Sequence, residues 1–149
     1  MVKKMSSADP RHLALSLLSR REHSRLEIAQ KLQKAGFSNG DIQPILDDLI
    51  KRDWLNEDRF VEMLVRSRFN QHYGPAKIRY DLQQKGISSN KIANALEIYQ
   101  EEWADSAKEL RNRRFGEIPP STPQMRAKQT RFLMSRGFLP DHIRYALKS

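Results

Sequence analysis

The stretch that decides the fold occurs three times in the chain, as KLQKAGFSNGDIQPIL at residues 31–46, DLQQKGISSNKIANAL at 81–96 and FLMSRGFLPDHIRYAL at 132–147. Each copy has Leu, then Gly four residues later, an apolar residue directly after the Gly, and Ile and Leu six and ten residues after the Gly. The shared positions are Leu32, Leu82 and Leu133; Gly36, Gly86 and Gly137; Ile42, Ile92 and Ile143; and Leu46, Leu96 and Leu147. A match at a fixed period of about fifty residues predicts a repeat architecture.

The repeated pattern is typical of a helix that stops sharply and is followed by a second helix. Glycine suits the residue just past a helix end, where φ is positive and a Cβ is unfavourable. Polar residues that can cap a new helix follow the first two glycines, and Pro140 suits the first turn of the helix after the third. We therefore expect Gly36, Gly86 and Gly137 to lie just past helix ends.

Each copy is preceded by one earlier helix, so each repeat has three. Apolar spacing predicts the earlier helix at 10–21, 58–70 and 104–115. The helix that follows begins at a capping box of Ser24 with Glu27 in the first copy, at Pro75 in the second and at Pro123 in the third. We expect an all-α protein of three three-helix repeats, stacked into an elongated, curved array because a fifty-residue unit buries little apolar surface alone. The expected divisions are a flexible N-terminus at 1–8 and repeats at 9–53, 54–102 and 103–149.

Two tryptophans stand at the starts of the second and third repeats. Trp54 is followed by Glu57 and Asp58, and Trp103 is preceded by two glutamates, so each is expected to be a buried joint with a polar rim. The third repeat is the least regular, since Gln129 stands where the first two repeats have Ile28 and Ile78.

Composition excludes several classes of protein. The chain has 149 residues, with 27 Lys and Arg against 18 Asp and Glu and a net charge of +9, which indicates a polyanionic partner. It has no cysteine, so disulfides and thiolate metal sites are excluded. Its longest apolar stretch, LALSLL at 13–18, is far below the roughly 20 residues of a membrane span, and its first residues are not typical of a secretory signal. We expect a soluble cytoplasmic protein.

Motifs that carry catalysis or cofactor binding are missing from the sequence. The four histidines have no metal-ligand spacing, and no phosphate-binding glycine loop or G-x-S-x-G nucleophile motif occurs. Adjacent acidic pairs point about 100° apart on a helix, so they do not form an acid–base pair. We expect no enzyme activity, cofactor or metal.

Basic residues gather in two places. In the middle repeat, five of them occur with two interleaved tyrosines, a combination that suits phosphate contact and base stacking. A second cluster comes just before the Pro-rich loop 116–124. The candidate partner-binding or nucleic-acid-binding residues are Arg66, Arg68, Tyr73, Lys77, Arg79, Lys85, Arg111, Arg113 and Arg114. The alternative is a solvated helical surface balanced by neighbouring acids.

Within the middle cluster, one shared face is favoured. Arg66 and Arg68 are two residues apart on a helix, so they diverge by about 200°. We expect the face to combine an exposed Arg68 with an exposed Arg79, and to include Lys85.

A helix–turn–helix DNA reader is a further alternative for the glycine turns. Against it, the helix after the first glycine carries Ile45, Asp47 and Asp48, whereas major-groove readers use Arg, Asn or Gln. A DNA-binding module and a pure protein-interaction scaffold both stay open as functions.

The stretch 54–88 carries a group of motifs: an aromatic-Leu-x-[DE]-[DE]-x-[RK]-[FY] start, an Arg-rich first helix, a [FY]-G-P-x-x-I-x-x-x-L run and a K-G-I cap. The residues are Trp54, Leu55, Glu57, Asp58, Arg59, Phe60, Arg66, Arg68, Tyr73, Gly74, Pro75, Ile78, Leu82, Lys85, Gly86 and Ile87. In these motifs the chain resembles the RecX family of regulatory proteins. The likeness extends to Trp103 with Ala104 and to the R-F-L-x-x-R-G-F run at 131–138.

The resemblance implies a cytoplasmic, non-enzymatic inhibitor of the recombinase RecA. Proteins like this bind along the groove of the RecA–DNA filament, suppress ATP hydrolysis and strand exchange, and so modulate recombination, DNA repair and the SOS response. The implied partners are the RecA nucleoprotein filament and, weakly and without sequence preference, DNA. We expect a monomer that does not bind membranes.

Overall fold

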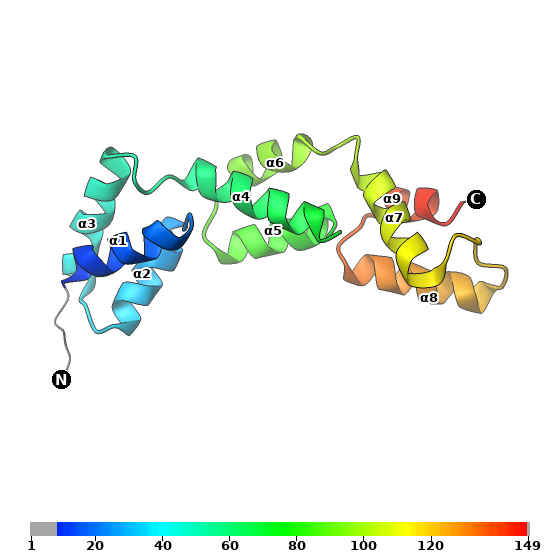
Figure 1. Cartoon of the computed structure of the whole chain (residues 1–149), viewed down its shortest axis with the longest axis horizontal. Helices are drawn as coiled ribbons and strands as arrows, with labels where there is room; N and C mark the ends of the chain where they lie inside the picture. The colour runs from blue at the N-terminus through cyan, green and yellow to red at the C-terminus, as the bar shows by residue number, and fades with distance from the viewer. Residues whose placement is uncertain (1–8, 149) are drawn as a thin grey trace. The chain divides into compact units, whose positions relative to one another are not determined.

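The computed structural model describes residues 9–148, and in that part of the chain it has nine α-helices and no strand (Figure 1). The expected flexible segment 1–8 lies outside the described residues. The helices are α1 (Pro10–Arg20), α2 (Arg25–Lys34), α3 (Asn39–Lys51), α4 (Glu57–Asn70), α5 (Pro75–Gln84), α6 (Ser89–Glu97), α7 (Trp103–Phe115), α8 (Pro123–Ser135) and α9 (Pro140–Ala146). The predicted all-α class and the three sets of three helices are confirmed. The repeat boundaries and the elongated, curved array stay predictions.

Local signals place the helix ends as expected. Ser24 and Glu27 form the predicted capping box of α2, and the Thr122 side chain accepts a hydrogen bond from the Met125 N–H at the start of α8. The repeated glycines Gly36, Gly86 and Gly137 have φ of 101°, 79° and 96°. Each therefore occupies the left-handed region just past a helix, which confirms that their role is structural.

The described chain divides into two compact units. The first contains residues 9–63 together with 85–87, and the second contains 64–84 together with 88–148. In the first unit, α1, α2 and α3 pack around one apolar core (Figure 1). Its fully or nearly buried residues are Ala14, Ile28, Ala29, Leu32, Ile42, Leu46, Leu49 and Leu55.

The second unit has its main core where α7 packs against α9 and α8. Leu133, Phe138 and Ile143 of the third repeat pattern are buried there. A second apolar centre is aromatic: the Trp103 ring lies 5.5 Å from the Phe69 ring and 5.7 Å from the Tyr99 ring. Trp103 is 4% exposed, so its predicted role as a buried joint is confirmed.

Trp54 does not have the buried role that the sequence predicts. Its side chain is 46% exposed, whereas the next residue, Leu55, is 1% exposed. The backbone N–H groups of both residues donate to the carbonyl of Leu49 as α3 ends. This tight cap directs one of the two apolar side chains inward, and the smaller Leu55 takes that place.

The third repeat buries polar groups where the other two are apolar. Gln129 is 4% exposed, and Ile28 and Ile78 at the matching positions are both fully buried. The Gln129 Oε1 atom has no hydrogen-bond partner among the described residues. This irregularity of the third repeat agrees with the sequence pattern.

The start of α5 is attached to the end of α8 through backbone hydrogen bonds. The Gly74 N–H donates to the carbonyl of Arg136 at 2.7 Å, and the Ala76 N–H donates to the carbonyl of Gly137 at 2.9 Å. These bonds satisfy N–H groups that a helix start leaves without intrahelical partners. They also bring Arg136 of the third repeat beside the basic residues of the second.

Candidate nucleic-acid interface

Asp81 on α5 joins two of the predicted cations. Its carboxylate lies 3.2 Å from Arg68 Nε on α4 and 3.0 Å from Lys77 Nζ one helical turn earlier on α5. The Asp81 side chain is only 16% exposed, while those of Arg68 and Lys77 are 31% and 39% exposed. Two partly accessible cations thus share one carboxylate, which leaves a local excess of positive charge in a fixed position.

Aromatic rings lie beside these cations. Lys77 Nζ is 5.5 Å from the centre of the Tyr80 ring, and Tyr80 is 55% exposed. The guanidinium of Arg136, at the end of α8, is 4.1 Å from the centre of the Tyr73 ring. Arg136 also donates from Nη2 to the backbone carbonyl of Gln71 at 2.7 Å. We call the set Arg68, Tyr73, Lys77, Tyr80 and Arg136 the α5 patch.

Arg136 was missed in the sequence analysis. The residue belongs to the R-G-F run at 136–138, whose sequence indicates a helix cap and the family resemblance but no partner contact. Its closeness to Tyr73 depends on the backbone hydrogen bonds between the start of α5 and the end of α8. No spacing along the chain indicates such a contact.

The favoured combination of Arg68 with Arg79 is not what the structure has. Arg68 is half-buried and forms an ion pair with Asp81. The second cation on that carboxylate is Lys77. Arg79 is two residues from both Lys77 and Asp81 on α5, so it points about 200° away from them. It is exposed, as expected, and has no ion-pair partner among the described residues; Arg66 is also exposed.

Lys85 is engaged in a contact within the first compact unit. Its Nζ lies 2.9 Å from the Glu27 carboxylate, which also pairs with Arg21 at 3.0 Å. Burial raises the pKa of Glu27, but hydrogen bonds from Arg21, Lys85 and the Ser24 N–H outweigh it and lower that pKa to about 2. Lys85 therefore joins the second repeat to the first through Glu27, whereas Arg68 pairs with Asp81 in the second compact unit.

Arg111 is a correction to the second predicted cluster. It is fully buried, and its Nη2 donates to Asn112 Oδ1 at 2.6 Å and to the carbonyl of Gly116 at 3.0 Å. The side chain closes the end of α7 against the following loop, so it offers no surface cation. Arg113 and Arg114 are exposed, and Arg114 lies 4.8 Å over the Phe132 ring.

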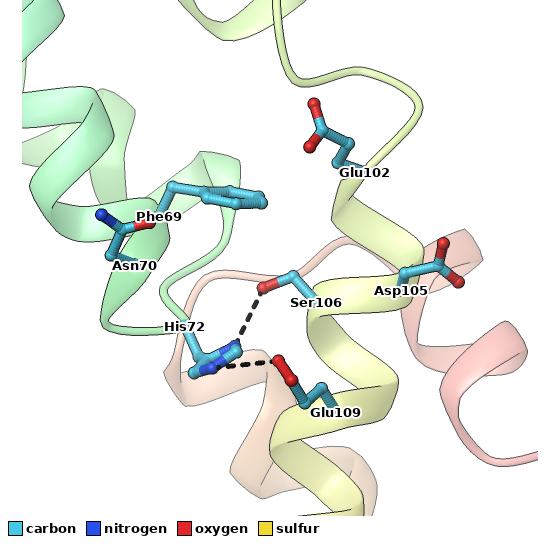
Figure 2. Close-up of a pocket in the computed structure, with 7 residues that line it drawn as sticks. All are labelled: Phe69, Asn70, His72, Glu102, Asp105, Ser106 and Glu109. Carbon is cyan, nitrogen blue, oxygen red and sulfur yellow. Dashed lines mark hydrogen bonds and ion pairs between the residues drawn. The ribbon is translucent and has the colours of Figure 1, made fainter.

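A cavity of about 440 Å³ lies in the second unit (Figure 2). In Figure 2 the His72 ring points toward α7, where Nδ1 is 3.2 Å from Ser106 Oγ and Nε2 is 3.3 Å from the Glu109 carboxylate. His72 has φ of 61° at the end of α4. These contacts connect α4 to α7 across the cavity. The lining residues are Phe69, Asn70, His72, Glu102, Asp105, Ser106 and Glu109.

Residues 9–148 contain no group of three or more His, Asp and Glu side chains placed to hold a metal ion. None of the helices there has the length and apolar character needed to cross a membrane.

The geometry defines an all-α protein of three-helix domains with a basic and aromatic surface on the second. Family models for the first, second and third three-helix domains of RecX match residues 11–49, 56–96 and 100–147. The chain belongs to the RecX family.

Relatives support this over nearly the whole length. The regulatory protein RecX of Halorhodospira halophila is 40% identical over 136 residues, which cover 91% of this chain and 84% of the relative. That of Pseudomonas entomophila is 41% identical over 133 residues, covering 89% and 86%. The crystal structure of RecX from Lactobacillus salivarius aligns with a TM-score of 0.79 and 27% identity, covering 92% of this chain and 91% of that one. The relatives in sequence are named as regulatory proteins.

Proposed function

We propose that this protein binds the RecA–DNA filament and inhibits RecA recombinase and ATPase activity, and thereby modulates recombination, DNA repair and the SOS response. Membership of the RecX family supports a regulatory role. The observation that carries the proposal is the arrangement at Asp81, where Arg68 and Lys77 from two helices are held side by side. Preset cations of this kind suit a phosphate backbone, because little side-chain freedom is lost on binding.

The aromatic residues of the α5 patch give it a second means of contact. Tyr80 is accessible, and a tyrosine ring can stack on a nucleobase or pack on a protein side chain. Arg136 is held against Tyr73, so its charge is added to those of Arg68 and Lys77 at the start of α5. A surface that combines charge with aromatic rings fits a nucleoprotein groove, which offers both phosphates and protein.

The protein acts, in this proposal, without catalysis and without a cofactor. Its effect on ATP hydrolysis comes from occupying the filament, since inhibition of another enzyme requires only binding. We further propose that it works in the cytoplasm as a monomer. Sedimentation at the concentration used for inhibition tests the monomer directly.

The test is a charge change confined to the α5 patch. The triple variant Arg68→Gln, Lys77→Gln and Asp81→Asn removes both cations together with their shared carboxylate, so no unpaired charge is left half-buried. The single variant Arg79→Gln is the matched control, because it also lowers the net charge by one and lies on the same helix. Both variants should give the wild-type helical signal in circular dichroism.

We expect the triple variant to inhibit RecA-driven ATP hydrolysis at least about tenfold less well, a loss of about 1.4 kcal/mol, and the control to stay near wild type. The dependence of binding on salt should also become shallower, by about one unit of log–log slope per lost phosphate contact. Full inhibition by a folded triple variant would remove the α5 patch from the interface. Arg113 and Arg114 of the third repeat would then be the next residues to change.

A DNA-binding module that acts without RecA is the second candidate, and the exposed Tyr80 beside Lys77 favours it. A protein-interaction scaffold, whose charge serves only solubility, is the third. The affinities for bare DNA and for RecA–DNA filament in the same salt separate the three. The filament regulator prefers the filament, the module binds both equally, and the scaffold binds neither through its charge.

A further inference from the structure

Trp54 is a large apolar side chain that the fold holds at the surface. It is 46% exposed, although its backbone is fixed by the cap that ends α3. The Trp54 N–H donates to the carbonyl of Leu49 at 3.0 Å, and Asp53 before it turns the chain with φ of 63°. The exposure therefore follows from an ordered turn.

Two arginines flank the indole ring. The Cζ atom of Arg52 is 5.1 Å from the ring centre, and that of Arg11 at the start of α1 is 5.8 Å away. Both guanidinium groups are held by Asp48, at 3.0 Å from Arg52 Nε and 2.5 Å from Arg11 Nη1. One carboxylate positions two cations here, as Asp81 does in the second repeat, but these residues come from the first.

We propose that Trp54, Arg11 and Arg52 form a stacking site for one base of a single-stranded nucleic acid. The accessible part of the indole stacks on the base, and the two guanidinium groups contact the phosphates on either side of it. Stacking on an aromatic ring needs no particular base, because every base has a π face, and arginine adds attraction to both the phosphate and the base.

The charge around the ring favours a nucleic acid over a protein segment as the ligand. Each arginine uses one of its nitrogens on Asp48, so further N–H groups are left to face a second anion. Lys51, which is exposed, directly precedes Arg52 in the chain. The chain as a whole carries a net charge of +9.

This site deepens the proposed function by naming a second point of nucleic-acid contact, and it rests on that proposal only for the identity of the natural strand. It lies in the first compact unit and shares no residue with the α5 patch. Its test therefore uses free single-stranded DNA without recombinase, so that failure of one proposal does not imply failure of the other.

The experiment uses the two tryptophans of the chain as reporters, with an oligothymidylate as the probe. Trp103 is 4% exposed, so the variant Trp54→Phe should show no quenching of fluorescence when the probe is added. The variant Trp103→Phe should be quenched, because Trp54 is then the only indole. Should Trp103→Phe fail to fold, quenching of the wild type and its loss in Trp54→Phe give the same answer.

Affinity is measured by the anisotropy of a labelled oligothymidylate. We expect Trp54→Ala to weaken binding about fivefold or more, Trp54→Tyr to retain most of it, and Arg11→Gln with Arg52→Gln to reduce its salt dependence. Tyr145→Ala is the matched control, because Tyr145 is 42% exposed and lies beside Lys108 in a similar cation–π contact.

Wild-type affinity of a folded Trp54→Ala for the oligothymidylate would overturn the stacking site. If that variant has also lost its inhibition of RecA, the Trp54 surface belongs to a protein partner. Lost DNA affinity in Trp54→Ala, together with full filament inhibition by the α5 patch variant, would support this site and remove the α5 patch from the filament interface.

Discussion

Gly74 and Gly137 lie so close together that a Cβ atom on Gly74 would be 2.4 Å from the carbonyl carbon and oxygen of Gly137. Gly74 precedes α5 and Gly137 follows α8, so residues more than sixty positions apart meet backbone to backbone. The approach allows the hydrogen bonds from Gly74 to Arg136 and from Ala76 to Gly137. It is also what brings Arg136 beside Tyr73 in the α5 patch.

Gly74→Ala should therefore destabilise the protein. The atoms that a new methyl group would meet belong to the backbone, which cannot move aside as a side chain can, and overpacking of this kind costs about 1–3 kcal/mol. Urea unfolding followed by circular dichroism measures the change. Gly40→Ala in α3 is the control, since its nearest atom, Ser38 Oγ, is 3.8 Å away, and it should leave stability unchanged or slightly raised.

Gly86→Val tests the helix cap of the second repeat. Gly86 has φ of 79°, a conformation that costs a residue with a Cβ about 1 kcal/mol or more, and its new Cβ would lie 3.1 Å from the Leu26 side chain. We expect a lower midpoint of thermal unfolding. Ala93→Val, at an exposed position in α6, controls for a valine in this repeat. An unchanged midpoint for Gly86→Val would contradict the cap.

The two tryptophans should differ in their contribution to stability. Trp103→Ala leaves a cavity between Phe69 and Tyr99 and should lower the free energy of unfolding by roughly 3–5 kcal/mol. Trp54→Ala removes a half-exposed ring with its cation–π contacts and should cost less, about 1–2 kcal/mol. Chemical denaturation of both variants under the same conditions makes the comparison. If both variants lose the same free energy of unfolding, the difference in exposure between the two tryptophans does not determine their contribution to stability.

Glu27 should make stability depend on acidic pH. Its folded pKa of about 2 lies below the usual 4.5, so its stabilisation is complete above about pH 4.5 and is lost as the pH falls toward 2. The shift corresponds to a contribution on the order of 3 kcal/mol at neutral pH. We expect Glu27→Gln to be less stable than wild type at pH 7, with a gap that is about half as large at pH 3. A gap that does not change with pH would contradict this prediction.

Gln129→Leu should stabilise the third repeat. The change removes a buried amide whose Oε1 lacks a partner among the described residues, and it restores the apolar character that Ile28 and Ile78 have in the other repeats. We expect a gain of about 1 kcal/mol in the free energy of unfolding. Gln124→Leu, exposed on the same helix, should change it by less than about 0.5 kcal/mol. If Gln129→Leu is less stable than wild type, the Gln129 amide has a hydrogen-bond partner in solution.

The candidate interface was predictable from the sequence only in part. The residues Arg68, Tyr73 and Lys77 were found because basic and aromatic residues occur together in one short segment. The combination of Arg68 with Lys77 was not found, because it depends on Asp81, which pairs with a residue on another helix. The place of Arg136 is not predictable for the same reason. Arg111 is buried, and Lys85, although partly exposed, pairs with Glu27 in the first compact unit.

The sequence by itself determined the helices, their ends and the threefold repeat of this protein. Caps such as Ser24 with Glu27 and the positive φ of Gly36 depend on residues a few positions apart, so local pattern was sufficient. Only the tertiary structure decided which side chains are buried and which cations stand together. Trp54 is exposed and Leu55 buried, although both are apolar neighbours, because burial depends on segments far apart in the chain that meet at that point. Periodicity indicates which face of a helix is apolar, but it does not indicate which other segment that face contacts.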